Sequence, residues 1–215
     1  MPLPYHQNWR YFADKAAKEN DSQELMKHIR QLLQLLGEDY PAPVDPESSL
    51  QPIAATPQGW REFENQAQIS EFLLSAVAAT GANFGNVQAF DSVNGTLKIV
   101  AQHGFGSEFL TYFEVVTCDG ASACAQALGG RRRMVVENVA TDPIFEGQNS
   151  AAVMLRANAL SVQSTPLFGV SGDLLGVVST HSDHPRTFSA CELRRLDDLV
   201  AELMASADGS TQAAD

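Results

Sequence analysis

Two cysteines near the middle of the chain are the side chains best suited to covalent chemistry. Cys118 and Cys124 lie six residues apart, on either side of an Asp119-Gly120 turn, and could in principle reach one another. Thiol redox chemistry needs a low-pKa thiolate and a resolving partner. The Asp119 carboxylate works against this, because a neighbouring negative charge raises the pKa of a thiol. Redox turnover or sensing by Cys118 and Cys124 therefore stands as one hypothesis.

The cysteine count also bears on the cellular compartment. Three cysteines, the third being Cys191, are too few and too odd in number for a disulfide scaffold in a chain of 215 residues. The first residues lack the charged-then-apolar pattern of a secretion signal. The longest uncharged stretch, 72–90, contains Gly, Asn and Gln residues that a membrane-spanning helix would have to desolvate. We expect a cytoplasmic protein with no membrane partner.

The histidines allow several kinds of chemistry. His181 could be a ligand contact, a metal ligand or a pH-sensitive switch, and it could equally be a hydrogen-bonded structural residue. His103 has no partner at metal-ligand spacing, and His181 and His184 are three residues apart across an expected turn. Because this spacing is a weak metal signal, we predict no metal site.

Other side chains suit a small-molecule site, in which apolar walls supply burial and a few polar groups fix orientation. The phenylalanines could form the wall or simply the core. Arg156 could pair with a carboxylate or phosphate of a ligand, or with a neighbouring acid at the surface. Polar residues on two expected strands would share one face by two-residue alternation and form the floor. The candidate residues are Phe105, Phe109, Phe113, Phe145, Arg156, Gln163, Thr165, Ser179 and His181.

Most enzyme classes lack their signatures here. The sequence has no G-x-S-x-G nucleophile elbow, no phosphate-binding G-x-x-x-x-G-K-[ST] and no H-E-x-x-H. Asp197 and Asp198 occupy consecutive positions of an expected helix and point in different directions, so they do not form a general acid/base pair. We expect no catalytic residues, with the thiol chemistry of Cys118 and Cys124 as the exception left open.

The charge of the chain argues against nucleic acid as a partner. The formal net charge is -12, and the only dense basic cluster is Arg131-Arg132-Arg133. Nonspecific nucleic-acid affinity comes from phosphate neutralisation by Lys and Arg, which an acidic chain with one such triplet supplies poorly. We expect the triplet to lie at the solvent side of a strand edge, where charge discourages strand pairing.

Hydrophobic periodicity and turn residues predict an α+β fold with a mainly antiparallel sheet. Helices are expected at both ends of the main domain, on one face of the sheet, with the middle insertions on the other face. An Asn94-Gly95 hairpin turn with both residues tolerant of positive φ is expected between the first two strands. The expected helices are 69–80, a short one with Phe109 and Phe113, 122–128, part of 142–158, and 189–205. The expected strands are 83–90, 97–102, 134–136, 160–167 and 174–181.

The N-terminal quarter has a different organisation. Apolar residues at helical spacing over residues 1–36 predict an αα-hairpin whose seam must pack on the main domain or on a second copy. Five prolines over 37–59 predict a linker. The main domain is expected over 60–206. Small polar residues over 207–215 predict a disordered tail.

Four segments resemble a bacterial GAF domain: GANFGNVQAFDSVNGTLKIVAQHGFGSEFL, CDGASACAQAL, VVENVATDPIF and LSVQSTPLFGVSGDLLGVVSTH. The resemblance covers about residues 60 to 206. It implies a five- or six-stranded sheet with helices on both faces, of the GAF/PAS-like kind, with a ligand pocket between sheet and insertions and dimerisation through the flanking helices. It also implies that the segment 122–128, which contains Cys124, lids the pocket, although Ala125 stands where the common pattern has Gly. The segment 138–145 is the loop after the third strand.

The resemblance implies a sensory or regulatory domain of bacterial signal transduction that binds a small molecule of unknown identity. Its state would pass on through helix packing, through homodimer contacts or to a signalling protein partner. Cofactors are unknown, and the Cys-His dipeptide expected for bilin attachment is absent. Some GAF-like proteins reduce free methionine sulfoxide with cysteines in this general region, which is the form the redox alternative takes. A third interpretation is a dimerisation module with an empty or collapsed pocket.

Overall fold

The computed structural model describes residues 66–169 and 171–211. The predicted N-terminal hairpin, the proline-rich linker, the start of the predicted main domain and the last four residues lie outside the described residues. Within them, the predicted helices and strands appear in the predicted order, with one further short strand, Val115–Thr117, that was not predicted. The bounds are α3 (Gln66–Ala79), β1 (Phe84–Asp91), β2 (Thr96–His103), α4 (Ser107–Tyr112), β3 (Val115–Thr117), α5 (Ala123–Gly130), β4 (Met134–Val136), α6 (Asn149–Arg156), β5 (Ser161–Phe168), β6 (Leu174–Ser182) and α7 (Ala190–Thr211).

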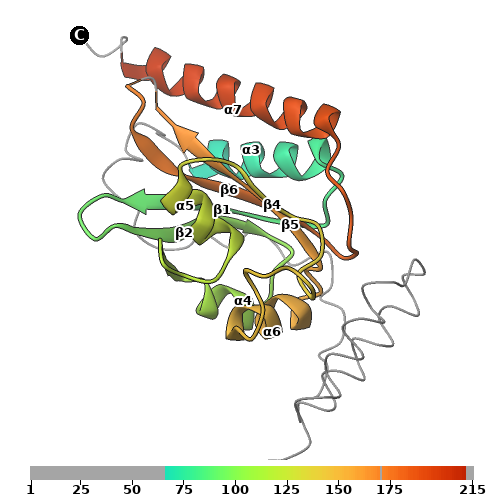
Figure 1. Ribbon diagram of the computed structural model, residues 1–215. Coiled ribbons are helices and arrows are strands. Elements are labelled where there is room, and N and C mark those ends of the chain that lie inside the picture. Colours follow the sequence, from blue (N-terminus) through green and yellow to red (C-terminus); the bar gives the residue numbers. More distant parts are fainter. Residues whose placement is uncertain (1–65, 170, 212–215) are drawn as a thin grey trace, which may run out of the picture.

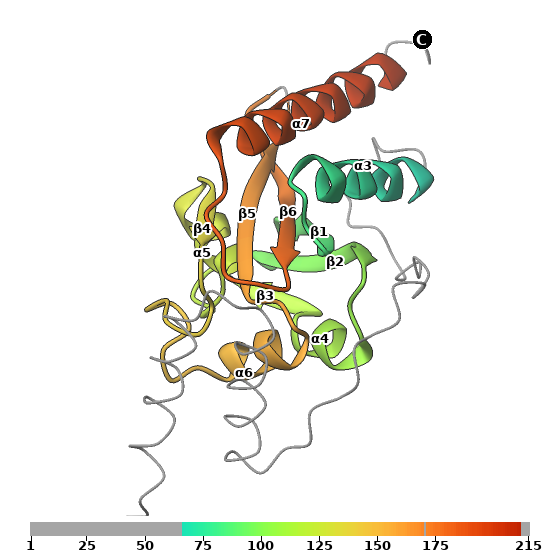
Figure 2. The same cartoon turned by 90° about the vertical axis from the view of Figure 1, so that its right-hand side faces the viewer.

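The strands form one six-stranded sheet in the order β3-β2-β1-β6-β5-β4. Every neighbouring pair is antiparallel. Helices α3 and α7 cover one face, and α4, α5 and α6 lie on the other, so the sheet is the middle of three layers (Figures 1 and 2). The α+β class, the antiparallel sheet and the two helical layers are thereby confirmed.

Each face of the sheet has its own apolar core. On the α3 and α7 side, fully buried side chains of Leu73, Ala76 and Leu196 meet Val87 and Val178 of the central strands. On the other side, a second core joins the sheet to α4, α5 and α6; its members include Phe105, Phe109, Phe113, Leu128, Phe145 and Met154. Because successive side chains of a strand point to opposite faces, the same strands supply both cores.

Helix α3 forms as the spacing of its apolar residues predicts, and it ends where Gly81 adopts a φ of 59°. A second glycine, Gly85, brings the start of β1 close beneath this helix. A Cβ atom at Gly85 would lie 2.7 Å from Val77 Cγ2 and 2.9 Å from Leu73 Cδ1. Only a residue without a side chain therefore lets α3 pack on β1 at this distance.

The hairpin between β1 and β2 is confirmed, but its turn is wider than predicted. Residues 92–95 separate the two strands, and Gly95 has positive φ (67°) whereas Asn94 does not. The Asp91 carboxylate accepts the backbone N–H groups of Val93 and Asn94 at 3.1 and 3.2 Å. An acidic side chain that binds the turn amides thus replaces the two-residue turn.

Helix α7 begins at the predicted capping box. The backbone N–H of Glu192 donates to Ser189 Oγ at 3.2 Å, and the Glu192 carboxylate accepts the Ser189 N–H at 2.7 Å. The helix extends to Thr211, beyond the predicted end at Ala205. No helix within the described residues is both long enough and apolar enough to cross a membrane.

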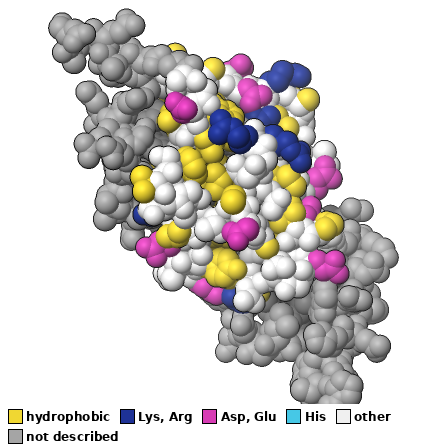
Figure 3. Space-filling model, turned by 60° about the vertical axis from the view of Figure 1, so that its left-hand side comes forward, with side chains coloured by type: hydrophobic (Ala, Val, Ile, Leu, Met, Phe, Trp, Pro, Cys, Tyr) yellow, Lys and Arg dark blue, Asp and Glu magenta, His cyan; other side chains and the backbone are white. Residues whose placement is uncertain are grey.

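The arginine triplet lies immediately before β4, which is an edge strand of the sheet. Arg131 and Arg132 are exposed, and the guanidinium of Arg133 forms an ion pair with Asp197 of α7. Lys and Arg side chains gather at one end of the face in Figure 3, whereas Asp and Glu are scattered over it. The predicted position at a strand edge is confirmed.

Candidate functional site

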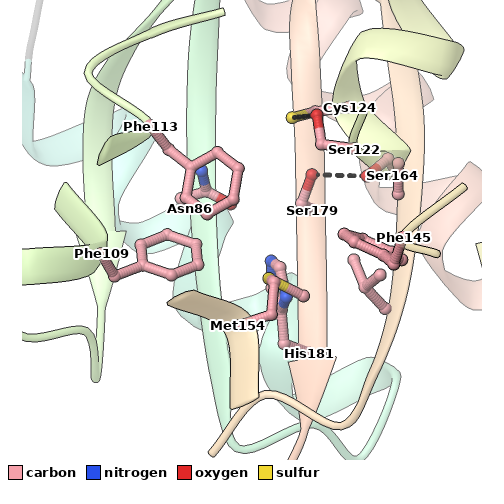
Figure 4. Close-up of a pocket in the computed structure, with 12 residues that line it drawn as sticks. Asn86, Phe109, Phe113, Ser122, Cys124, Phe145, Met154, Ser164, Ser179 and His181 are labelled. Atoms are coloured by element: carbon pink, nitrogen blue, oxygen red, sulfur yellow. Dashed lines mark hydrogen bonds between the residues drawn. The ribbon is translucent and has the colours of Figure 1, made fainter. Parts of the chain in front are cut away.

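A small cavity lies between the sheet and the layer of α4, α5 and α6. Its free volume is about 20 Å³, which is room for a single water molecule. Figure 4 shows aromatic side chains on two sides of it and polar side chains of the strands between them. The lining residues are Asn86, Phe109, Phe113, Ser122, Ala123, Cys124, Phe145, Met154, Val162, Ser164, Ser179 and His181.

The floor of the cavity is a row of polar residues that crosses the middle of the sheet. Asn86 of β1 pairs with Ser179 of β6, and Ser179 pairs in turn with Ser164 of β5. The two serine hydroxyl oxygens lie 2.8 Å apart and share a hydrogen bond. All three side chains are buried. Because cross-strand partners point to the same face, this row places polar atoms under an otherwise apolar space.

His181 lies beside this row, at the end of β6. Its imidazole is 4% exposed, and within residues 66–169 and 171–211 neither Nδ1 nor Nε2 has a hydrogen-bond partner. The Phe105 ring lies 5.0 Å away, edge to face with the imidazole. Burial lowers the pKa of His181 to about 3, because an apolar site disfavours the charged imidazolium. The ring is therefore neutral at physiological pH, with one donor and one acceptor available.

Asn86 presents a second unfilled polar atom. Its Oδ1 is buried and has no hydrogen-bond partner among the described residues. Leaving a buried polar atom without a partner costs about 1–3 kcal/mol. Asn86 and His181 lie on adjacent strands, two residues apart in the register, because His181 pairs with Phe84. Two such groups, Asn86 and His181, thus border the same small cavity.

The cover of the cavity comes from the helical layer. Phe109 belongs to α4, Phe113 follows it directly, and Met154 belongs to α6. An ion pair joins the two helices on the outside, with Arg156 Nη2 2.5 Å from Glu108 Oε1. Since α4 has only six residues, its position depends on such contacts with its neighbours.

Helix α5 closes the remaining side. Its N-cap residue Ser122 accepts the Ala125 N–H at 3.3 Å, and the Ser122 hydroxyl lies 3.2 Å from Cys124 Sγ. The segment 122–128, for which the family resemblance implies a lid, thus borders the cavity with Ser122, Ala123 and Cys124. Ala125 is fully buried at the position where the common pattern has Gly.

The thiol groups differ sharply in environment. Cys124 lines the cavity and is 8% exposed, and burial raises the pKa of its thiol, since the thiolate would be desolvated. Cys118 and Cys191 are exposed, and all three cysteines are free thiols. Burial thus disfavours a nucleophilic thiolate at the cysteine that lines the cavity.

The prediction that Gln163 and Thr165 share a face with Ser179 and His181 is wrong. The register pairs Gln163 with Thr180 and Thr165 with Val178, so both lie on the α3 and α7 face. The reason is a bulge between Leu167 and Phe168, where β6 holds one extra residue. Continued without this bulge, the first pair of the hairpin would bring Gln163 opposite Ser179.

Gln163 and Thr165 instead belong to a buried hydrogen-bond chain on the opposite face. Arg133 Nε donates to Thr165 Oγ1 at 2.8 Å, and the Thr165 hydroxyl donates to Gln163 Oε1 at 2.7 Å. Gln163 Nε2 then donates to Thr180 Oγ1 at 3.1 Å. The Thr180 hydroxyl lies 3.1 Å from that of Thr80, which follows α3. These bonds tie the edge of the sheet to the end of α3.

Two further predicted residues lie near the cavity without lining it. Phe105 is buried behind the wall, where it stacks on Phe109. Arg156 forms the ion pair with Glu108 described above, outside the cavity, which was the alternative to a ligand contact. His184 bonds to Asp183 at 2.8 Å, and the described residues contain no group of three His, Cys, Asp or Glu side chains that could hold a metal.

Sequence reasoning therefore places Phe109, Phe113, Cys124, Phe145, Ser179 and His181 at the cavity and misses Asn86, Met154, Val162 and Ser164. A signal for Asn86 exists in the sequence. Asn86 and Gln88 are polar residues two apart within a strand that is otherwise largely apolar, which places them on one face. Buried polar residues at such spacing are candidates for a site.

No family model matches the sequence. No curated protein matches it either. Solved structures do match. The GAF domain region of a protein from Geobacter sulfurreducens PCA has a TM-score of 0.57 at 15% identity, over 69% of this chain and 95% of that chain. The GAF domain/HD domain protein from Geobacter sulfurreducens has a TM-score of 0.55 at 17% identity, over 72% and 99%.

The fold is GAF-like. The type II free methionine-R-sulfoxide reductase from Thermoplasma acidophilum also matches, with a TM-score of 0.53 at 14% identity, over 68% of this chain and 94% of that chain. The GAF-like fold thus occurs both in GAF domains of larger proteins and in an enzyme. Since a fold hosts many functions, the choice between them must come from the site.

Proposed function

We propose that this GAF-like domain is a sensory module that binds a small molecule in the cavity between the sheet and α4, α5 and α6. The observation that carries the proposal is His181. Its buried, neutral imidazole lines the cavity, and neither ring nitrogen has a hydrogen-bond partner among the described residues. A structural histidine at 4% exposure would be expected to have at least one protein partner.

The size of the cavity sets a condition on binding. A volume of about 20 Å³ holds little more than a water molecule, so a larger ligand must displace part of the cover. Such a ligand binds a state in which α4 or α6 has moved, and its differential affinity for the two states is the free energy available for a signal.

The central strands also connect the cavity to α3 and α7 on the opposite face of the sheet, so a displacement at the cavity can reach these helices. Ser179 and His181 point to the cavity, and Thr180 between them points to the hydrogen-bond chain that ends at Thr80. A displacement of β6 therefore acts on both layers at once. Homodimerisation through α3 and α7 and contact with a signalling partner are further parts of the proposal.

A matched pair of variants on α5 tests ligand binding. Ala123 lines the cavity, and Gln126 is exposed on the same helix. Native mass spectrometry of the purified full chain identifies a co-purifying small molecule, and thermal shift measures its rebinding. We expect Ala123→Leu to abolish rebinding because the added methyl groups fill the cavity, while Gln126→Leu retains it. Rebinding that survives in both variants, or a protein that carries and rebinds no small molecule, would contradict the proposal.

Thiol redox chemistry is a second candidate, because Cys124 lines the cavity and free methionine-R-sulfoxide reductases share the fold. The raised pKa of the Cys124 thiol argues against it. The test is consumption of free methionine-R-sulfoxide with a thiol reductant. Turnover by the wild-type chain that is lost in Cys124→Ala or Cys118→Ala would favour this candidate over the sensory one.

A further inference from the structure

The polar groups that face the cavity define the kind of molecule it can accept. Among the described residues that line it, none is Lys, Arg, Asp or Glu. A charged ligand group would lose its hydration there without gaining an opposite charge. The chemistry of the walls therefore favours an uncharged molecule.

The polar atoms without hydrogen-bond partners narrow the chemical class of the ligand further. The neutral imidazole of His181 offers one N–H donor and one nitrogen acceptor, and the Asn86 amide offers Oδ1 as an acceptor and its NH2 group as a donor. A complementary ligand therefore carries both a hydrogen-bond acceptor and N–H or O–H donors. A primary carboxamide carries this set, with a carbonyl oxygen and two N–H groups in one plane. A ketone lacks the donors, and a carboxylate lacks them and carries a charge.

The apolar surroundings fit a small planar group. Phe109 and Phe113 lie with ring centroids 4.6 Å apart on one side of the cavity, and Met154 lies beside His181 (Figure 4). These side chains offer dispersion contacts to the faces of a flat ligand and no competing hydrogen bond.

We propose that the cavity binds a small uncharged molecule through a carboxamide group, which His181 and Asn86 recognise by hydrogen bonds. This inference rests on the proposed function of the cavity, and it adds the chemical class of the ligand. Binding satisfies the buried atoms that the folded protein leaves without partners.

Four probes of nearly equal shape test the class: acetamide, acetone, acetate and acetamidinium. Binding is followed in the full chain by NMR, from the methyl signal of Met154 and the imidazole nitrogen signals of His181. We expect acetamide to bind in the millimolar range, which suits a ligand of four heavy atoms. The other three probes should bind at least about tenfold more weakly.

Variants separate recognition from folding. His181→Phe and Asn86→Leu each remove unfilled atoms, and each should weaken acetamide by about tenfold while the preference over acetone falls. Thr96→Val is the matched control, because Thr96 Oγ1 is also buried without a partner but lies outside the cavity. If one of the two cavity variants fails to fold, the other carries the test.

The outcomes distinguish the two proposals. Selective acetamide binding that depends on His181 or Asn86 supports the carboxamide class. Equal binding of all four probes, or binding that neither variant weakens, overturns the class and leaves the cavity as a receptor. If no probe shifts the Met154 or His181 signals and no small molecule co-purifies, the cavity holds ordered water only, and both proposals fail.

Discussion

Ser164 of β5 and Ser179 of β6 lie directly opposite each other under the cavity, with hydroxyl oxygens 2.8 Å apart. One residue further along, Gln163 and Thr180 form the corresponding pair on the other side of the same sheet. The cavity floor and the buried hydrogen-bond chain are thus set by one register. A substitution at Ser164 or Ser179 therefore alters the cavity floor, whereas one at Gln163 or Thr180 alters the buried hydrogen-bond chain, and the two should affect stability differently.

The first prediction concerns pH. Below pH 6.5 the unfolded chain protonates His181, whereas the folded chain keeps it neutral down to a pKa of about 3. The unfolded state then binds more protons. The free energy of unfolding therefore decreases as the pH is lowered between these values, by up to about 1.4 kcal/mol per pH unit. Urea unfolding at pH 7.5 and 5.0 should show this loss in the wild-type chain and a loss smaller by about 2 kcal/mol in His181→Phe.

A control for this measurement is His103→Gln, because His103 is only partly buried. In His103→Gln the loss of stability that depends on His181 should remain. Parallel pH profiles for the wild-type chain and His181→Phe would show that burial does not hold His181 neutral.

The second prediction concerns thiol reactivity. Cys124 is buried and its pKa is raised, while Cys118 and Cys191 are exposed. In a colorimetric thiol assay at pH 8, two thiols should react quickly and a third at least about tenfold more slowly. Cys124→Ala should remove only the slow phase. Loss of a fast phase in that variant would mean that Cys124 is accessible and reactive.

The third prediction concerns the buried hydrogen-bond chain. Thr165→Val leaves Arg133 Nε and Gln163 Oε1 without their partner, so it should destabilise the protein by about 2 kcal/mol in urea unfolding. Thr165→Ser keeps the hydroxyl and should recover most of this loss. As a surface comparison, Ser171→Ala removes an exposed bond to Asp173 and should cost less than about 0.5 kcal/mol. Equal effects of Thr165→Val and Ser171→Ala would show that the chain contributes nothing beyond a surface bond.

The fourth prediction concerns the contact of α3 with β1. A methyl group at Gly85 would press on Leu73 and Val77, so Gly85→Ala should destabilise the domain by about 1–3 kcal/mol, measured by the shift in urea midpoint. Gly129→Ala is the control: a Cβ there meets Cys118 only at ordinary contact distances of 3.4 and 3.6 Å, so its effect should stay within about 0.5 kcal/mol. A neutral Gly85→Ala variant would mean that α3 can move away at little cost.

Sequence reasoning predicts the long elements of this domain well because their periodicity extends over several turns or pleats. Strand β3 escapes it, since Val115–Thr117 is too short to show an alternation and Val115 is half exposed. The choice of cavity residues on β5 fails for another reason. A bulge at the hairpin of β5 and β6 reverses which residues face the cavity, and nothing in the alternation of either strand alone reveals it.

The cavity residues that were predicted correctly share a different property. Phe109, Phe113 and Phe145 are large apolar side chains in short insertions, and such side chains must be buried against the sheet whichever way the strands are registered. The orphaned state of His181 and of Asn86 could not be predicted, because it depends on what the neighbouring strands and helices leave unbonded.

The absence of a side chain at Gly85 has a consequence for how a signal could leave the domain. Gly85 and Asn86 are consecutive, so a single peptide unit separates the backbone that touches α3 from the amide that borders the cavity. A ligand that shifts β1 by a fraction of an ångström would therefore move against α3 directly, because no hinge or connecting segment lies between the two contacts. Helix α3 packs so closely on β1 at Gly85 that the space between them cannot take up such a shift.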